Sequence, residues 1–329
     1  MKAVWFEKFG SAGEALQFGV QPTPEPKPGE VLVKVETTAI NPSDVKKRAG
    51  AFPDLLDGGL IIPHSDGAGT IVAVGAGVAS SRIGERVWVY QAQYGRRFGT
   101  AAQYVSVDDK RAPPLPDETS FEVGACLGIP AMTAHRCVLG DGPIAGQTIL
   151  ITGGAGRVGY YAIQWAKAAG AKVIATASND ADRDACLTLG ADAVCNHREP
   201  DWGTNVLKYN HGRPVDRVVE VEFGTNLEQV LCCIRTGGTI STYSSSQMGQ
   251  PQLPFVRMMF MDITIHLVIV YAMPEQAKTE ALVAINMALE RDDLKHRVAE
   301  VVPYLEMARA HEIIESGAVR GCVIARMSE

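Results

Sequence analysis

ILITGGAGRVGYYAIQWAKAAGAKVIATAS, residues Ile149 to Ser178, is the stretch of sequence that decides the fold. It begins as a short apolar strand, continues through a glycine-rich turn into a segment with helical spacing, and ends in a second strand. Gly154, Gly156 and Gly159 complete the pattern G-x-G-x-x-G in this strand–turn–helix context. The stretch therefore predicts the first unit of a dinucleotide-binding domain.

Each glycine of the pattern has an expected role. Gly154 can make the tight turn, Gly156 lacks a side chain that would block a pyrophosphate, and Gly159 lets the helix lie close to the sheet. The N–H groups and the dipole at the start of the helix then attract phosphate. The alternative is an ordinary glycine-rich turn, but the second strand follows at the spacing of a dinucleotide site.

The second strand ends without the acidic residue that usually binds the ribose 2′-hydroxyl of NAD. Ala177 stands at that position, followed by Ser178 and Asn179, with Arg183 further along. A hydroxyl, an amide and a guanidinium accept a 2′-phosphate, which a carboxylate would repel. The sequence predicts NADPH rather than NADH, although two nearby aspartates oppose this and Arg183 can also be read as a solvated helix charge.

The rest of the chain divides into two patterns. Up to about residue 122, short strands alternate with Gly/Pro turns, as in Val31–Ile40 and His64–Val78, which suggests a compact, barrel-like β domain. From about residue 123, strands and helices alternate, which predicts a parallel sheet covered by helices on both faces. The tail predicts helices near Pro274–Arg291 and Tyr304–Ser316 and a last strand, CVIARM, which we expect to pack onto the N-terminal domain.

Composition excludes several classes of protein. The 329 residues carry a net charge of −6, which does not favour nucleic acid or an anionic membrane. The longest apolar stretch, Ile263–Met273, is too short to span a bilayer. The N-terminus lacks the features of a signal peptide. The seven cysteines include no CxxC pair and are expected to be reduced, mostly as small buried side chains, so a cytoplasmic protein is predicted.

The segment ITIHLVIVY, residues 263–271, is too apolar for a free sheet edge. It predicts that the sheet extends across a homodimer, unless the segment is an internal strand of the core.

Several motifs together resemble the medium-chain dehydrogenase/reductase superfamily, and within it the zinc-free quinone oxidoreductases that include zeta-crystallin. Besides the glycine loop, the resemblance rests on motifs spread over nearly the whole chain: NPSD (Asn41–Asp44), PHSDGAGTIVAVG (Pro63–Gly75), GERV (Gly84–Val87), GIPAMTAHR (Gly128–Arg136), NHRE (Asn196–Glu199) and the ending HEIIESGAVRGCVI.

The resemblance implies a GroES-like catalytic domain of residues 1–123 and 263–329, with a Rossmann domain of residues 124–262 inserted in it. It places the active site in an interdomain cleft. It implies pyrophosphate contacts from Gly154, Ala155, Gly156, Arg157 and Val158, and a 2′-phosphate site at Ser178 and Arg183. The remaining implied cofactor residues are His197 near the adenosine, Asn226 and Tyr243, Ser244 and Ser245 along the groove, and Asn41, Thr133, His266, Val268 and Arg320.

The chain departs from these relatives around the substrate. Lys46 and Phe52 occupy positions that are often tyrosine, and Cys322 follows the C-terminal glycine where a basic residue is common, so Arg320 is the candidate substitute. The zinc members use an early cysteine, a GHE histidine and four clustered cysteines. None of these is present, and the seven histidines show no ligand spacing, so no metal is expected.

With no metal, the expected chemistry is hydride delivery from NADPH to an electron-poor acceptor, with the protein supplying position and a few donors. The candidate substrate residues are Asn41, Lys46, Phe52, Tyr90 and Tyr94, with Arg96 as a further donor. Lys46 is a candidate to stabilise a developing anion, or else a solvated lysine of VKKR. The spacing of residues does not identify a general acid.

Three functions remain open from the sequence. The first is an NADPH:quinone oxidoreductase. The second is a reductase of enones or enals. The third is a cofactor-binding protein with little turnover and a structural or RNA-binding role, against which the net charge argues.

Overall fold

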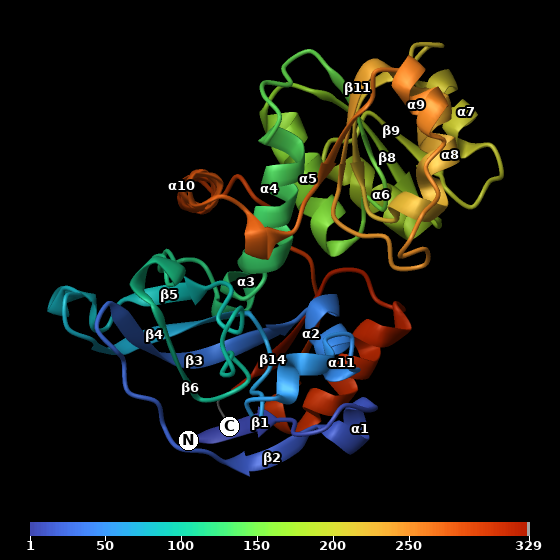
Figure 1. Cartoon of the computed structure of the whole chain (residues 1–329). Helices are drawn as coiled ribbons and strands as arrows, with labels where there is room; N and C mark the ends of the chain where they lie inside the picture. The colour runs from blue at the N-terminus through green and yellow to red at the C-terminus, as the bar shows by residue number, and fades with distance from the viewer. Residues whose placement is uncertain (328–329) are drawn as a thin grey trace. The chain divides into compact units, whose positions relative to one another are not determined.

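The computed structural model of the chain describes residues 1–327 (Figure 1). Its contacts divide the chain into two compact units. Unit 1 consists of Met1–Ile129 and Leu282–Glu329, and unit 2 consists of Pro130–Ala281. The boundaries expected from sequence, 123/124 and 262/263, both fall earlier in the chain. The second differs because the strand Thr264–Leu267 pairs with the parallel sheet of unit 2.

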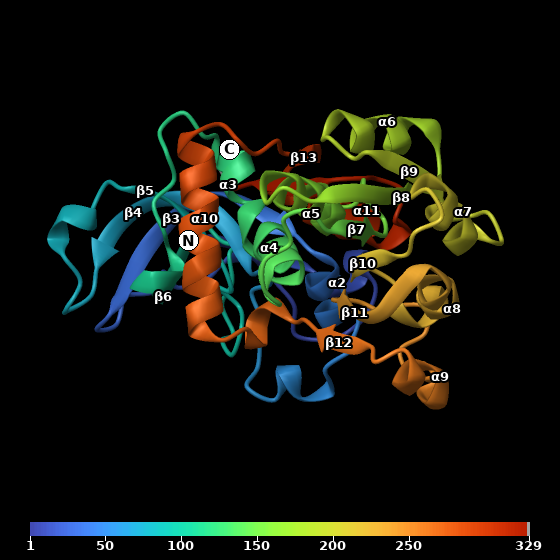
Figure 2. The same cartoon turned by 90° about the horizontal axis from the view of Figure 1, so that it is seen from above.

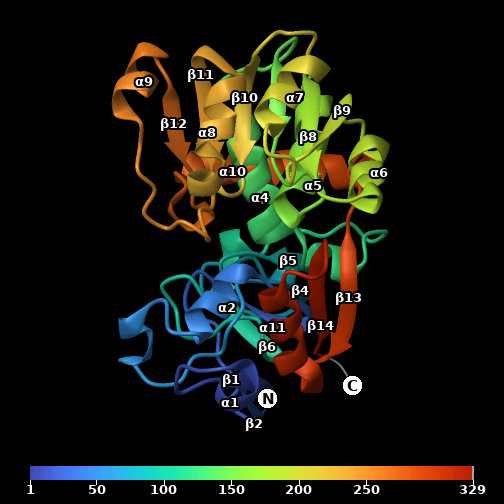
Figure 3. The ribbon, with the colours of Figure 1, turned by 90° about the vertical axis from the view of Figure 1, so that its right-hand side faces the viewer.

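Unit 2 is built on a six-stranded parallel sheet of order β12-β11-β10-β7-β8-β9, which Figure 3 shows from β12 at one edge to β9 at the other. The direction of strand addition reverses between β7 and β10, which is the switch point where such sheets bind ligands. The strands are β7 (Thr148–Ile151), β8 (Lys172–Ala177), β9 (Ala193–Asn196), β10 (Val215–Glu220), β11 (Ile234–Thr242) and β12 (Thr264–Leu267).

Helices connect these strands and cover both faces of the sheet. In Figure 1, α4 and α5 lie on one side of the strands and α7 and α8 on the other. Leu150, Ile174, Val218 and Ile240 come from four neighbouring strands and pack into one apolar core with α7 and α8. The helices are α4 (Met132–Leu139), α5 (Arg157–Ala168), α6 (Asp180–Thr188), α7 (Trp202–Tyr209), α8 (Phe223–Cys233), α9 (Phe255–Phe260) and η5 (Val270–Ala272), followed by α10 (Glu275–Glu290).

Strand β12 forms one edge of this sheet and bonds only to β11 among the described strands, as the view from above also shows (Figure 2). Leu267 is 74% exposed and Ile269 is 54% exposed. The segment that the sequence singles out as apolar therefore lies at a sheet edge and not in the interior of the core.

Unit 1 is a β-rich body around the long, curved strand β3. One path of strands has the order β13-β14-β3-β4-β5, β6 also pairs with β3, and β1 and β2 form a separate ribbon. All pairs are antiparallel except β13 with β14. The strands are β1 (Lys2–Trp5), β2 (Gln17–Val20), β3 (Glu30–Ile40), β4 (Asp66–Val74), β5 (Arg86–Val89), β6 (Tyr104–Asp108), β13 (Val298–Pro303) and β14 (Cys322–Arg326).

The C-terminal segment completes unit 1. Strand β14 pairs antiparallel with β3, from Val323 opposite Ile40 to Arg326 opposite Thr37, and α11 packs beside β14 (Figure 3). This confirms the expectation that the tail packs onto the N-terminal strands. The helices of unit 1 are α1 (Ala12–Ala15), α2 (Pro42–Arg48), η1 (Pro53–Leu56), η2 (Ser80–Arg82), η3 (Asp109–Arg111), α3 (Phe121–Gly124), η6 (Tyr304–Glu306) and α11 (Met307–Ser316), with the π-helix η4 (Leu127–Ala131) at the boundary.

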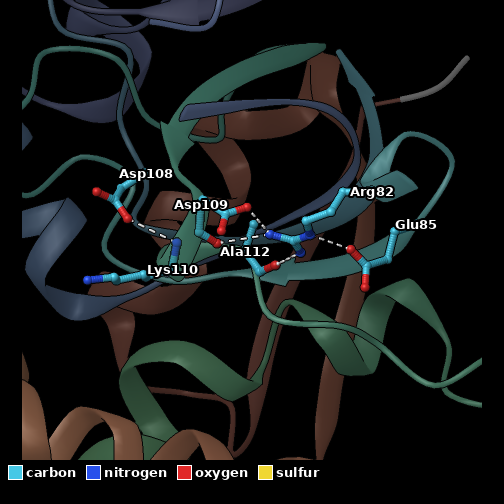
Figure 4. Close-up of polar contacts among 6 residues, drawn as sticks. All are labelled: Arg82, Glu85, Asp108, Asp109, Lys110 and Ala112. Carbon is cyan, nitrogen blue, oxygen red and sulfur yellow. Dashed lines mark hydrogen bonds and ion pairs between the residues drawn. The ribbon is translucent and has the colours of Figure 1, made fainter. Parts of the chain in front are cut away.

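The Arg82 side chain links the turn before β5 to the segment after β6 through hydrogen bonds and ion pairs (Figure 4). Its Nε donates to Glu85 Oε2 at 2.6 Å, its Nη2 donates to the Ala112 carbonyl at 2.6 Å, and its Nη1 pairs with Asp109. The guanidinium can serve several acceptors at once because its donors are fixed in one plane. These contacts hold the turn before β5 against the segment after β6.

Among the helices described within residues 1–327, none has the length and apolar character required to cross a membrane.

Candidate active site

The glycine loop after β7 depends on backbone conformation at Gly153 and on close packing at Gly154. Gly153 has a φ of +61°, so the tight turn expected at Gly154 is made one residue earlier. A Cβ on Gly154 would lie 2.9 Å from both Ala175 Cβ and Cys186 Sγ. Gly154 is therefore required because the loop packs directly on β8 and α6.

The next two glycines shape a cradle at the start of α5. Gly156 is the N-cap residue, and a Cβ there would meet only the Gly153 carbonyl oxygen, at 3.1 Å. A Cβ on Gly159 would lie 2.3 Å from that same oxygen. The loop backbone therefore leaves no space for a side chain at Gly159, whereas the position of a side chain at Gly156 is largely open. An open backbone surface at the N-terminus of a twelve-residue helix fits the pyrophosphate of a nicotinamide dinucleotide.

The end of β8 carries no carboxylate, and the following residues are only partly available to a ligand. Ala177 is buried and Ser178 is half-buried. Asn179 caps α6: Asp182 N donates to Asn179 Oδ1 at 2.9 Å, and Asn179 Nδ2 donates to Asp182 Oδ2 at 2.9 Å. Because both ends of the amide are engaged, Asn179 is held as a cap, which leaves Ser178 and Arg183 as the candidate 2′-phosphate ligands.

A pocket lies beyond the ends of β8 and β9. Arg183 lines it with an exposed side chain that pairs with Asp184 at 3.7 Å. His197, expected near the adenosine, is exposed in the turn after β9 and does not line the pocket. Asn205 and Tyr209 of α7 do line it, and no motif or spacing in the sequence marks them. The lining consists of Ala177, Asn179, Asp180, Arg183, Val194, Cys195, Asn196, Glu199, Asn205 and Tyr209.

Glu220 is a buried carboxylate at the end of β10, beside the switch point. Its Oε1 accepts from Glu222 N at 2.5 Å and from Asn226 Nδ2 at 2.8 Å, while its Oε2 has no hydrogen-bond partner. Burial raises the pKa of Glu220 to about 7, against the lowering effect of these hydrogen bonds. No signal in the sequence marks Glu220, because a single glutamate in a strand belongs to no motif.

Glu220→Gln is expected to change how stability depends on pH. The folded protein keeps the Glu220 proton up to a pH of about 7, whereas the unfolded chain loses it near the ordinary glutamate pKa of 4.5. Stability therefore falls as pH rises through this window, by at most about 3 kcal/mol at 1.36 kcal/mol per unit. Urea unfolding from pH 4.5 to 8 should show the variant gaining stability relative to the wild type. Parallel curves for the two proteins would contradict the assignment.

Most of the remaining predicted cofactor residues of unit 2 lie on β12 or directly after the ends of β11 and β12. Ser245 and Val268 are held near the end of β11, where Ser245 Oγ accepts from Gly224 N at 2.9 Å and Val268 N donates to the Thr242 carbonyl at 2.8 Å. His266 Nδ1 lies 3.0 Å from Asp141 Oδ2. Burial raises the pKa of Tyr243 far above its usual value, so this phenol remains neutral.

Ser244 Oγ lies 3.0 Å from Ser246 Oγ, in the same segment after β11. Thr133 is buried on α4.

In unit 1, a buried polar cluster surrounds the start of α2. We call it the α2 site and define it as Asn41, Asp44, Lys47, Asp66 and Gln93. Asn41 N donates to Asp44 Oδ2 at 2.9 Å, and Asn41 Nδ2 donates to Asp66 Oδ2 at 2.9 Å. Lys47 Nζ donates to Gln93 Oε1 at 2.5 Å. The helix start is thereby tied to β4 and to the loop after β5.

Burial shifts the titration of all three ionisable groups of the α2 site. It raises the pKa of Asp66 to about 8 and the pKa of Asp44 to about 6. It lowers the pKa of Lys47, against the opposing attraction of the two carboxylates. Asp44 Oδ1 and Asp66 Oδ1 are both buried without a hydrogen-bond partner. At neutral pH Asp66 is therefore mostly protonated and Asp44 mostly ionised.

The structure distinguishes the two lysines of VKKR. Lys46, the expected substrate residue, is exposed, whereas Lys47 is half-buried, and the Asp44 and Asp66 carboxyls act on its pKa through their charge. Tyr90 is buried, and Phe52 and Tyr94 are 54% and 42% exposed.

Neither arginine proposed for unit 1 is an unengaged donor. Arg96 donates to Glu30 Oε1 at 2.8 Å and to the Ser106 carbonyl at 2.6 Å, so its guanidinium group is engaged in contacts within unit 1. Arg320 donates to the Gly317 carbonyl at 2.6 Å.

His64 and His311 of unit 1 form a neutral buried pair. His64 Nε2 lies 2.9 Å from His311 Nε2, and His64 Nδ1 lies 3.0 Å from Thr38 Oγ1. Burial lowers the pKa of His64 well below its usual value and that of His311 to about 3. Within residues 1–327, no group of three or more His, Cys, Asp or Glu side chains is arranged to hold a metal ion. The residues present do not fit a zinc site.

Comparison with known proteins identifies the family. Residues 27–117 match the alcohol dehydrogenase GroES-like domain, and residues 158–286 match the zinc-binding dehydrogenase domain. The human quinone oxidoreductase is 30% identical over 97% of this chain and 95% of its own length. The chain belongs to the quinone oxidoreductase group of the medium-chain dehydrogenase/reductase superfamily.

Solved structures agree with this membership. A mycobacterial protein complexed with NADPH superposes with a TM-score of 0.88 at 25% identity, covering 99% of this chain and 100% of its own. An NAD-dependent alcohol dehydrogenase superposes with a TM-score of 0.88 at 28% identity over the whole of both chains. Like other members of the quinone oxidoreductase group, this protein is an oxidoreductase that binds a nicotinamide cofactor and acts on a small molecule. It combines a GroES-like unit with a Rossmann unit, and the described residues 1–327 offer no set of zinc ligands of the kind that the name of its second domain implies.

Proposed function

We propose that this oxidoreductase uses NADPH to reduce quinones. The observation that carries the proposal is the open glycine cradle of α5 combined with the uncharged end of β8, where Ala177 replaces the acid that NAD sites use. The quinone oxidoreductases among its relatives support the choice of acceptor. When bound, NADPH supplies a hydride to the electron-poor ring of the acceptor.

In this proposal most of the residues that bind the cofactor come from unit 2, and Asn41 and Arg320 come from unit 1. The segment Gly154–Val158 holds the pyrophosphate, and Ser178 and Arg183 hold the 2′-phosphate. Arg183 opposes the negative charge of Asp180 and Glu199 in the same pocket, so its guanidinium provides most of the attraction for that group. The other proposed cofactor residues are Asn41, Thr133, His197, Asn226, Tyr243, Ser244, Ser245, His266, Val268 and Arg320.

Asn41, Lys46, Phe52, Tyr90 and Tyr94 of unit 1 are the proposed substrate residues. Phe52 and Tyr94 expose aromatic rings that can pack against a planar ring, and Asn41 has an amide fixed by Asp66. These residues orient the acceptor and limit the access of water to it. We also propose a homodimer, supported by the apolar, one-sided edge of β12.

Arg183→Ala is expected to lower the affinity for NADPH by about tenfold while leaving NADH binding nearly unchanged, because only NADPH carries the 2′-phosphate. Fluorescence titration with both cofactors measures this. Arg198→Ala is the matched control, since Arg198 is exposed nearby but does not line the pocket. Equal losses for NADPH and NADH, or a wild-type preference for NADH, would refute the NADPH assignment.

Cofactor oxidation across a panel of 1,4-quinones and enones tests the acceptor. Faster turnover of quinones supports the proposal, and faster turnover of enones or enals identifies a double-bond reductase. Cofactor binding without turnover of either class identifies a binding protein of structural or RNA-binding function.

A further inference from the structure

Two-electron reduction of a quinone requires a proton as well as a hydride. The hydride breaks a C–H bond of the nicotinamide, and its electron pair leaves the acceptor with one anionic oxygen. An O–H bond must then form at that oxygen, and a positioned acid accelerates this step. The ammonium group of the half-buried Lys47 lies in unit 1 and is not one of the proposed cofactor or substrate groups.

We propose that Lys47 is the proton donor of the reaction and that Asp44 and Asp66 hold its ammonium group in place. This inference rests on the proposed function of quinone reduction. The Nζ–H bond of Lys47 breaks as the O–H bond of the product forms, which leaves a neutral amine. A solvent proton then restores the ammonium group, so the cycle consumes one hydride and one proton.

The position of Lys47 supports this role. It lies on α2, whose N-cap is Asn41, and its Nζ donates to Gln93, which lies between Tyr90 and Tyr94 in the chain. Asn41, Tyr90 and Tyr94 are all proposed substrate residues. Lys47 is therefore fixed among the side chains that would surround the acceptor, whereas Lys46 on the same helix is exposed.

The charged and polar groups around Lys47 are compatible with a role as a proton donor, in addition to a structural role as a cation. Asp44 on the same helix attracts the ammonium group, whereas Asp66 on β4, which is mostly protonated, attracts it less. Gln93 is neutral, and burial keeps His64, two residues before β4, neutral. Burial lowers the pKa of Lys47, and an amine with a lowered pKa releases its proton more readily at neutral pH. One lysine facing two carboxyls, one of them mostly protonated, also keeps the cluster close to electrically neutral.

The test compares Lys47→Met with the control Lys110→Met, using quinones whose hydroquinone products differ in pKa. An alkyl-substituted quinone gives a strongly basic product anion that needs a proton, whereas a halogenated quinone gives a weakly basic anion that does not. Lys47→Met is expected to lower kcat about 100-fold with the alkyl quinone and no more than about threefold with the halogenated one. Lys110→Met should leave both rates near the wild-type values, because Lys110 is exposed on η3 and has no role in the proposed site.

Lys47→Arg separates proton donation from charge. Arginine keeps the positive charge between the carboxyls but does not release a proton at neutral pH. If Lys47 is the acid, Lys47→Arg should retain NADPH affinity and thermal stability yet lose kcat as Lys47→Met does. In the wild type, kcat should fall as pH rises through the Lys47 pKa. This alkaline limb should be absent from both Lys47 variants, and Asp44→Asn, which removes an attractive charge, should shift it to lower pH.

The outcomes separate this inference from the proposed function. A wild type that oxidises NADPH with neither quinone refutes quinone reduction and the role of Lys47 together. A wild type that turns over both quinones, while Lys47→Arg keeps full activity or Lys47→Met loses the same factor with every acceptor, overturns only the role of Lys47.

Discussion

Gly159→Ala is expected to destabilise unit 2 by about 2–3 kcal/mol and to abolish measurable cofactor binding. The added Cβ would lie 2.3 Å from the Gly153 carbonyl oxygen and 2.9 Å from Gly154 Cα, and neither backbone atom can move without shifting the loop. The displaced loop would carry the cradle of α5 away from its position against β8. Urea unfolding and titration with NADPH measure the two effects.

Gly156→Ala is the matched comparison within the same loop. Its Cβ would meet only the Gly153 oxygen at 3.1 Å, so this variant should fold with nearly wild-type stability. It should nevertheless lose affinity for NADPH by on the order of tenfold, because the methyl group occupies the open side where the pyrophosphate approaches. If Gly156→Ala were the less stable variant, or bound NADPH as the wild type does, the proposed orientation of the cradle would be incorrect.

Gly128→Ala is expected to destabilise unit 1 by about 2–4 kcal/mol. The Cβ would lie 2.1 Å from Oδ1 and 2.5 Å from Cγ of Asp66. The carboxyl group would have to turn away, which breaks the hydrogen bonds that its Oδ2 accepts from Asn41 Nδ2 at 2.9 Å and Ile129 N at 2.8 Å. Thermal unfolding gives the loss, and activity should fall with it because Asn41 loses its fixed orientation.

A double-mutant cycle shows whether Asp66 is the cause. Asp66→Ala removes the atoms that clash, so adding Gly128→Ala in that background should cost much less than it does in the wild type. A coupling energy of about 1–3 kcal/mol is expected. Purely additive losses would show that Gly128 is required for a reason other than the carboxyl group beside it.

The glycine loop shows how far local patterns reach. The motif identifies the strand, the turn and the helix, because apolar periodicity and glycine spacing depend on neighbouring residues only. It does not identify which glycine needs a positive φ or which needs space. Gly153 has the positive φ, and Gly154 is restricted by Ala175 and Cys186, which come from β8 and α6.

The two lysines of α2 show a different limit. Lys46 and Lys47 are adjacent and chemically identical in the sequence, so spacing could not indicate which of them faces the interior. The contact with Gln93, 46 residues away, and the burial of Asp66 on β4 make Lys47 the perturbed group. Glu220, Asn205 and Tyr209 were missed for the same reason, since their neighbours come from other elements of unit 2.

The sequence by itself determined the family, the two kinds of domain and the dinucleotide loop, because these depend on periodicity, glycine placement and motifs that are local in the chain. Only the tertiary structure decided which carboxyl and ammonium groups are buried together at the α2 site and beside the switch point. Their pKa values depend on desolvation and on charges brought close by folding, and neither quantity can be obtained from the order of residues alone.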